Sequence, residues 1–242
     1  MHHPATRPNP QPVTQPDGAG YLPGLSTDLV IFGFHENQLK ILLLEYENTN
    51  LFALPAGFIG ADENVNDAAR RALVERTGLP DIYLEQFYVF GDRSRHDPAP
   101  LRAIMAGRGI TAPDDHWLLK RFVSVGFYAL VDFTRAVPHP DPLADRCDWY
   151  DLSALPPLML DHAAMVGKAL DTLRANLDRR LIGFNLLPGT FTMNDLQSLY
   201  ETILGERLNR TSFQRRMLGL NILERLDKKW TGGAHKAPYL YR

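Results

Sequence analysis

The chain has 242 residues, of which 45% are hydrophobic and 22% charged, so it is long enough for one large domain or two smaller ones, each with a core. Its formal net charge of −2 excludes a chain that is strongly basic or acidic as a whole. With the single cysteine Cys147 it can form neither an internal disulfide nor a cysteine-ligated zinc site, and we expect that thiol to act as a small buried hydrophobe.

The sequence contains no segment that would place it in a membrane. No apolar run approaches the length of a membrane span, and the amino-terminal stretch has no apolar signal-peptide core. We therefore expect a cytoplasmic protein without a membrane partner. Residues 1–24 contain six prolines and show no apolar periodicity, which predicts a disordered, Pro-rich lead-in.

Strands dominate the region that follows, with a helix among them. An N-cap at Asn64 or Asn66 and a helix-ending glycine at Gly78 predict a helix from Val65 to about Arg76. A long amphipathic helix is expected over 161–180. β-branched and apolar residues favour strands over 26–34, 39–46, 52–59, 83–90 and 121–133, with a short one at Trp149 and Tyr150.

Residues 99–120 are poorly patterned. They predict a long loop with one helical turn near 101–105. Loops of this length inside a compact domain are usually functional or mobile. Just before it, a short loop after the strand over 83–90 carries Arg93, Arg95 and His96.

The stretch from Leu54 to Leu79, LPAGFIGADENVNDAARRALVERTGL, resembles the Nudix box. That pattern is Gly, five residues, Glu, seven residues, then Arg-Glu-apolar-x-Glu-Glu-x-Gly-apolar. The matching residues are Gly57, Glu63, Arg71, Leu73, Glu75, Gly78 and Leu79. Ala72 and Arg76 stand where the pattern has glutamates.

The two departures change the chemistry of this helix. Glutamates at positions i, i+3 and i+4 share one helix face and can hold divalent cations beside a diphosphate. Here that face offers Ala72, Glu75 and Arg76, so one carboxylate remains, and Arg76 brings a positive charge where a cation would bind. We expect no metal, no cofactor and no catalytic residue in a Nudix-like domain over 25–180. The alternative is a Nudix hydrolase of nucleoside diphosphate derivatives such as ADP-ribose, in which Glu63 and Glu75 carry the metals.

The last part, 181–242, has a different character. It carries nine Lys/Arg against five Asp/Glu, a net charge of +4, whereas the preceding part carries −6. Thr192 and Gly205 bound a helix over 194–204, and Asn209, Thr211 or Ser212 caps a second helix that ends near Leu218. Strands over 222–228 and 237–241 flank a hairpin turn at 229–233. Helix, turn, helix and hairpin is the order of a winged helix-turn-helix.

Basic and polar residues of the second helix and the hairpin are the expected contacts to duplex DNA, because Arg and Gln suit base edges and Lys suits phosphates. They are Arg210, Ser212, Gln214, Arg215 and Arg216 in the helix, and Lys228, Lys229 and Lys236 in the hairpin. Two alternatives remain open. One is a helical subdomain with a solvated basic face, and the other is a protein that binds an acidic partner.

Together the two halves resemble the Nudix-related transcriptional regulators over 26–241. The segments that carry the resemblance are the box, YLEQFYVFGD, FVSVGFYALV and GFNLLPGTFTMNDLQSLYETILGERLNRTSFQRRM, the last being absent from plain Nudix hydrolases. The resemblance implies an α/β fold, a Nudix-like α/β/α sandwich with a C-terminal winged helix-turn-helix domain. It also implies a homodimer, in our interpretation a repressor, that binds a palindromic operator and a small-molecule effector.

Members of that family sense ADP-ribose-type nucleotides or sugars such as arabinose. The degenerate box slightly favours the sugar-sensing branch. We expect the effector beside Gly57 and Phe58, with Arg93 and Arg95 as polar contacts, because these residues lie at strand ends facing the box turn. The Pro-rich start and the extra length over 98–120 depart from the family pattern.

Overall fold

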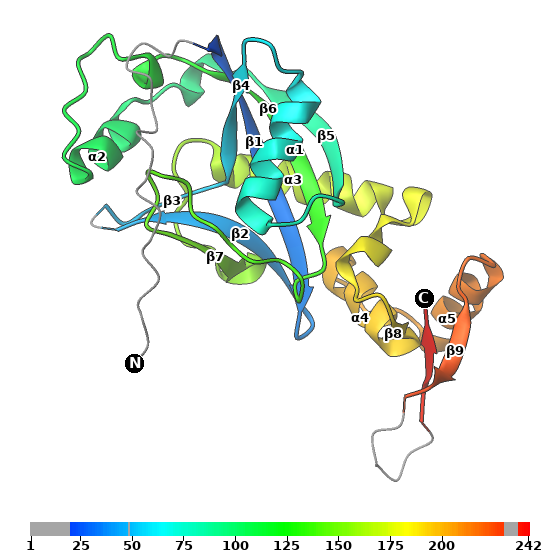
Figure 1. Cartoon of the computed structure of the whole chain (residues 1–242). Helices are drawn as coiled ribbons and strands as arrows, with labels where there is room; N and C mark the ends of the chain where they lie inside the picture. The colour runs from blue at the N-terminus through cyan, green and yellow to red at the C-terminus, as the bar shows by residue number, and fades with distance from the viewer. Residues whose placement is uncertain (1–19, 48, 230–236) are drawn as a thin grey trace, which may run out of the picture.

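The structure, a computed structural model, describes residues 20–47, 49–229 and 237–242, with the backbone alone for 178–180. Its larger part is a mixed β-sheet between helices (Figure 1). The strands of this sheet are β1 (Tyr21–His35), β2 (Gln38–Tyr46), β3 (Leu51–Ala53), β4 (Ala56–Gly60), β5 (Tyr83–Phe90), β6 (Val123–Val131) and β7 (Arg146–Asp151).

The sheet is built around the long strand β1. The order is β3-β2-β1-β6-β5, with β4 paired to β1 and β7 paired to β2, and β1 runs parallel to β6. β1 begins earlier than the expected strand over 26–34, because Tyr21 pairs with Gly60 of β4. Pairing between residues so distant in the chain is a feature that local strand propensity does not contain.

Alternate residues of β1 pack against opposite layers. Leu29 and Ile31 belong to the core cluster that includes α1 (Val65–Thr77), while Val30 and Phe32 belong to the cluster that includes α3 (His162–Arg180). Side chains of a strand point to its two faces in turn, so a strand apolar at every position can be covered on both. The expected α/β/α sandwich is confirmed.

The expectation of a long loop over 99–120 is wrong in part. Residues Ala99–Gly107 form the helix α2, which is followed by the 3-10 turn η2 (Trp117–Leu119). The Asp97 side chain accepts a hydrogen bond from the Ala99 amide at 2.9 Å, and Ile104 and Met105 are buried. A nine-residue helix with two buried residues is too short to give a clear apolar period.

The carboxyl-terminal part has the expected winged-helix order. Its elements are η4 (Ile182–Leu186), β8 (Phe191–Thr192), α4 (Met193–Leu204), α5 (Arg210–Gly219), β9 (Arg225–Lys228) and β10 (Tyr239–Tyr241). Thr192 forms a capping box with Asp195, and the Asn209 side chain caps α5 by accepting from the Ser212 amide at 3.0 Å. The two-residue strand β8 carries no sequence pattern and was not expected. Most of the expected hairpin turn lies outside the described residues.

The winged-helix part packs on the carboxyl-terminal half of α3 (Figure 1). Leu173 and Leu177 of α3 share a core cluster with Leu199 and Tyr200 of α4. The Arg174 guanidinium donates from Nε to the Ile203 carbonyl at 2.7 Å. One helix therefore covers the sheet and supports the winged helix. Within the described part of the chain, no helix combines the length and apolarity that a bilayer span requires.

Candidate effector cavity and DNA-binding surface

The box carboxylates are held by an arginine of the same motif. Glu63 accepts from Arg71 Nε at 2.8 Å through Oε1, and through Oε2 from Arg71 Nη2 at 2.8 Å and the Gly60 amide at 3.0 Å. Arg71 Nη2 also donates to the Phe58 carbonyl at 2.8 Å. The hydrogen bond from Arg71 holds the pKa of Glu63 below its usual value. Glu63 thus fixes the box turn to the helix.

Glu75, the remaining carboxylate of the helix face, is also engaged. It accepts from Arg71 and from Arg76, each at 3.3 Å. Ala72 is fully buried, and a Cβ placed on Gly57 would lie 2.9 Å from the Ala72 Cβ. The close packing of turn and helix explains a glycine at position 57. Among the described residues, no group of three His, Cys, Asp or Glu side chains is arranged to hold a metal.

The Arg76 side chain does not lie on an exposed helix face where a metal could bind. It is only 7% exposed, and its Nη1 donates to the carbonyls of His139 at 3.2 Å and Pro140 at 2.7 Å. The expectation that this residue places its charge where a cation would bind therefore needs refinement. The guanidinium is directed into a loop packed against the end of α1.

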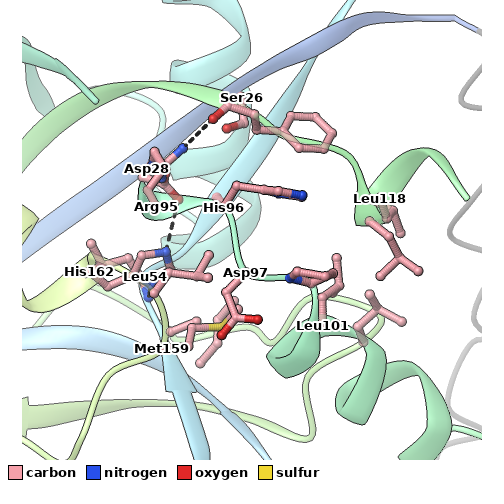
Figure 2. Close-up of a pocket in the computed structure, with 18 of the residues that line it drawn as sticks. Ser26, Asp28, Leu54, Arg95, His96, Asp97, Leu101, Leu118, Met159 and His162 are labelled. Atoms are coloured by element: carbon pink, nitrogen blue, oxygen red, sulfur yellow. Dashed lines mark hydrogen bonds and ion pairs between the residues drawn. The ribbon is translucent and has the colours of Figure 1, made fainter. Parts of the chain in front are cut away.

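A cavity of about 200 Å³ lies between the first half of β1, the strand β4, the helix α2 and the start of α3. One end is polar: Figure 2 shows Asp28, Arg95 and His162 together, with Leu101 and Leu118 on the other side. The apolar wall also includes Phe58, whose ring lies 4.7 Å from that of Trp117 and 5.5 Å from that of Phe122. A pocket with an apolar wall and a few convergent polar groups is the usual form of a small-molecule site.

The polar end is a buried charge network. Arg95 donates to both carboxylate oxygens of Asp161 at 3.0 and 3.2 Å, and its Nη2 lies 3.6 Å from Asp28 Oδ2. Asp28 also accepts from the Ser124 hydroxyl. His162 Nδ1 accepts from the Leu54 amide at 3.0 Å. Burial lowers the pKa of His162 below its usual value, although Asp28 and Asp161 oppose this.

The polar end also touches the start of α3. Asp161 occupies the N-cap position of that helix and His162 is its first residue. Since the opposite half of α3 carries the winged helix, the same helix borders both the cavity and the winged-helix part.

Of the residues expected to bind an effector, Phe58 and Arg95 line the cavity, while Gly57 and Arg93 do not. Gly57 lies under the box helix, and Arg93 is exposed in the 3-10 turn η1 (Arg93–Arg95). Sequence reasoning did not find Asp28 and His162. The signal for Asp28 was a carboxylate directly before the apolar run of a central strand, where burial is costly unless the charge is paired.

The helix α5 presents most of its expected DNA contacts to solvent. Arg210, Ser212 and Arg215 are exposed and Gln214 is half-buried, whereas Phe213 and Met217 face the core. Arg216 is exposed as well, but its guanidinium carbon lies 5.9 Å from the ring centre of Tyr200 and 5.6 Å from that of Phe213. Two adjacent arginines thus point in different directions, as helical geometry requires.

The wing provides the remaining cations. Lys228 lies over the ring of Tyr239 at 5.3 Å, and Lys229 is exposed at the end of β9. Arg225 lies over the same ring at 4.7 Å and was not among the expected contacts. Lys236 lies outside the described residues. The described cations nevertheless place positive charge beside α5.

Comparison with known proteins resolves the family. Residues 23–169 match the NUDIX domain family, and residues 183–242 match the NrtR DNA-binding winged helix domain. A protein of Acinetobacter baylyi named "ADPR responsive transcriptional repressor NtrR" is 31% identical over 227 residues, covering 91% of this chain and 82% of that protein. The chain belongs to the Nudix-related transcriptional regulators of the NrtR type.

Two solved structures of this type have the same arrangement of parts. Shewanella oneidensis NrtR aligns with a TM-score of 0.68 and 27% identity, covering 90% of this chain and 93% of that one. The same protein complexed with a 27mer DNA aligns with a TM-score of 0.67 and 27% identity, covering 90% and 92%. The predicted fold, a Nudix domain followed along the chain by a winged helix, is confirmed.

Proposed function

We propose that this chain is a cytoplasmic transcriptional repressor that binds an operator through α5 and the wing and releases it when ADP-ribose fills the Nudix cavity. The observation that carries the proposal is the joining, in one chain, of an exposed basic helix and a cavity-bearing Nudix domain. The similarity to a repressor named as responsive to ADP-ribose covers 91% of the chain and so includes both parts.

DNA binding is supported by the placement of charge on α5. Arg210 and Arg215 reach solvent at the helix that a helix-turn-helix places in the major groove. A single winged helix reads a short half-site, so we propose that two copies bind a palindromic operator as a homodimer.

ADP-ribose is the effector that the relatives support, and they give no support to the slight sequence-based preference for a sugar such as arabinose. Degeneration of the box removes metal ligands, but it leaves the cavity next to it. The chain in this proposal binds ADP-ribose without hydrolysing it, because Arg71 and Arg76 engage the two box carboxylates. The aromatic and aliphatic wall suits a flat base, and the buried polar end suits sugar hydroxyls.

The test starts from duplexes that the purified chain selects from a randomised pool. Fluorescence anisotropy then measures their affinity with ADP-ribose and with arabinose at equal concentration, and light scattering measures the mass of the complex. We expect release by ADP-ribose alone and two copies per duplex. Failure to select any duplex contradicts the DNA-binding function, and release by arabinose alone contradicts the effector.

A further inference from the structure

The segment 137–144 forms part of the cavity wall and lies against the end of α1. The amide of Val137 donates to the Thr77 carbonyl and that of His139 to the Arg76 carbonyl, both at 3.0 Å. Beyond these contacts, Asp141 accepts from the amides of Leu143 and Ala144 at 2.8 and 2.7 Å, which closes a turn. Asp141 and Leu143 line the cavity.

The side chain of Arg76 also ties this segment to the box helix. Its guanidinium supplies the donor for two carbonyl oxygens, those of His139 and Pro140, and its other terminal nitrogen meets Glu75. The Nε atom has no hydrogen-bond partner. A buried charge kept in this incomplete setting carries a desolvation cost, so the contacts that it does make matter to the local structure.

From these contacts we propose that Arg76 is a positioning residue for the effector cavity. Standing where the Nudix pattern has a metal-binding glutamate, it clamps the segment 137–144 and so fixes the wall that carries Asp141 and Leu143. The proposal rests on the proposed function for the identity of the effector, but the clamp itself does not depend on it. A glutamate at position 76 would direct a carboxylate at two carbonyl oxygens and release the segment.

The single cysteine gives a direct measurement of the clamp. Cys147 is 9% exposed in β7, and the backbone of His139 lies against its thiol. Burial raises the pKa of Cys147 to about 12, although the charge of Arg76 opposes this, so the covered thiol is unreactive. Loss of the Arg76 charge alone would raise the pKa of this thiol and slow its labelling, so faster labelling in a variant can come only from opening of the segment. Labelling by a fluorescent maleimide therefore reports how often the segment 137–144 opens.

The variants are Arg76→Ala, Arg76→Glu and the conservative Arg76→Lys, with Arg70→Ala as the matched control. Arg70 is an exposed arginine of the same helix that does not line the cavity. We expect Cys147 labelling to accelerate about tenfold in Arg76→Ala and further in Arg76→Glu, since the carbonyls of His139 and Pro140 lose the charged donor that ties them to the helix. Arg76→Lys should be intermediate, and Arg70→Ala should match the unchanged chain.

The second readout is ligand affinity. ADP-ribose affinity measured by calorimetry should fall about tenfold in Arg76→Ala, in proportion to the opening of the wall, while DNA affinity without ADP-ribose stays unchanged. A thermal melt of each variant, together with the conservative Arg76→Lys, shows whether a loss of affinity comes from a chain that does not fold. Equal labelling of Arg76→Ala and Arg70→Ala overturns the clamp. Faster labelling with unchanged ADP-ribose affinity overturns its role in the cavity.

Failure of the proposed function and failure of the Arg76 clamp can be told apart. If the unchanged chain does not bind ADP-ribose, the proposed function fails, and Cys147 labelling still decides whether Arg76 holds the wall.

Discussion

The helices α1 and α5 both carry arginines, but two of the arginines of α1 are used in the opposite way to those of α5. In α1, Arg71 and Arg76 meet two carboxylates and three backbone carbonyls of the same domain. In α5, Arg210, Arg215 and Arg216 are all exposed. Charges satisfied inside the protein hold its parts together, whereas exposed cations on one helix attract an external polyanion. The difference teaches that the motif of the first helix has become structural, and that the charge available for binding is in the second.

Hydrolysis is the sharpest way to break this comparison. We expect no turnover of ADP-ribose with Mg²⁺, because the box carboxylates are engaged by arginines and Ala72 supplies no ligand. An active enzyme would release product at about 1 per second or more. Chromatography of AMP and ribose phosphate over hours measures this, with an intact-box Nudix hydrolase as the positive control. Turnover at that rate would mean that Glu63 and Glu75 still hold metals.

The next effect compares two arginines that lie two residues apart, the buried Arg95 and the exposed Arg93. Arg95→Ala should lower the free energy of unfolding by about 3–5 kcal/mol, because it leaves Asp28 and Asp161 without their cation. Arg93→Ala should change it by less than about 0.5 kcal/mol. Urea unfolding measures both. Equal effects would show that the polar end of the cavity does not depend on its charge pairing.

The two arginines of α5 sharpen the other side of the comparison. Arg215→Ala should cost roughly 1–3 kcal/mol of operator affinity and relax specificity at one base position. Arg216→Ala should cost less affinity, since its guanidinium already lies over Tyr200 and Phe213. Anisotropy titrations on the selected duplex and on single-base variants measure this. If neither variant differs from the unchanged chain, α5 is not the recognition helix.

A pH series tests the buried histidine. The folded-state pKa of His162 is lowered, so below about pH 6.5 the unfolded chain binds a proton that the folded chain does not. Stability should therefore be complete above this value and fall by about 1.4 kcal/mol per pH unit below it, until the folded pKa is reached. The measurement is the difference in unfolding free energy between the unchanged chain and His162→Gln, in which other titrating groups cancel. A difference that stays constant from pH 7.5 to about 5.5 contradicts the neutral buried state.

The smallest effect concerns phosphate contacts. Lys228→Ala or Lys229→Ala should reduce the slope of log affinity against log salt by about one unit and weaken all duplexes alike. Lys168→Ala is the matched control, since Lys168 lies on α3 over the ring of Tyr88. A slope that changes as much in the control as in the wing variants would remove the wing from the DNA-binding surface.

Local sequence patterns determined the elements whose ends have a chemical signal. Gly78 and Gly205 end α1 and α4 with positive φ, and Thr192 begins α4 through its side chain. The same kind of evidence placed the box, its missing carboxylates and the basic character of α5. Among the short elements, β8 was not found and α2 was expected only as one helical turn near 101–105, because few residues carry their pattern.

The effector cavity was decided by tertiary structure. Asp28, Arg95 and His162 come from a strand, a 3-10 turn and a helix that are far apart in the chain, so their proximity has no local signal. The direction of the Arg76 side chain likewise depends on a distant loop, because its acceptor His139 lies 63 residues further along the chain. Sequence by itself determined which residues carry charge and which helices they occupy. Only the packing of distant segments decided which of those charges are satisfied inside the protein and which face solvent, because burial and pairing depend on what lies across the fold.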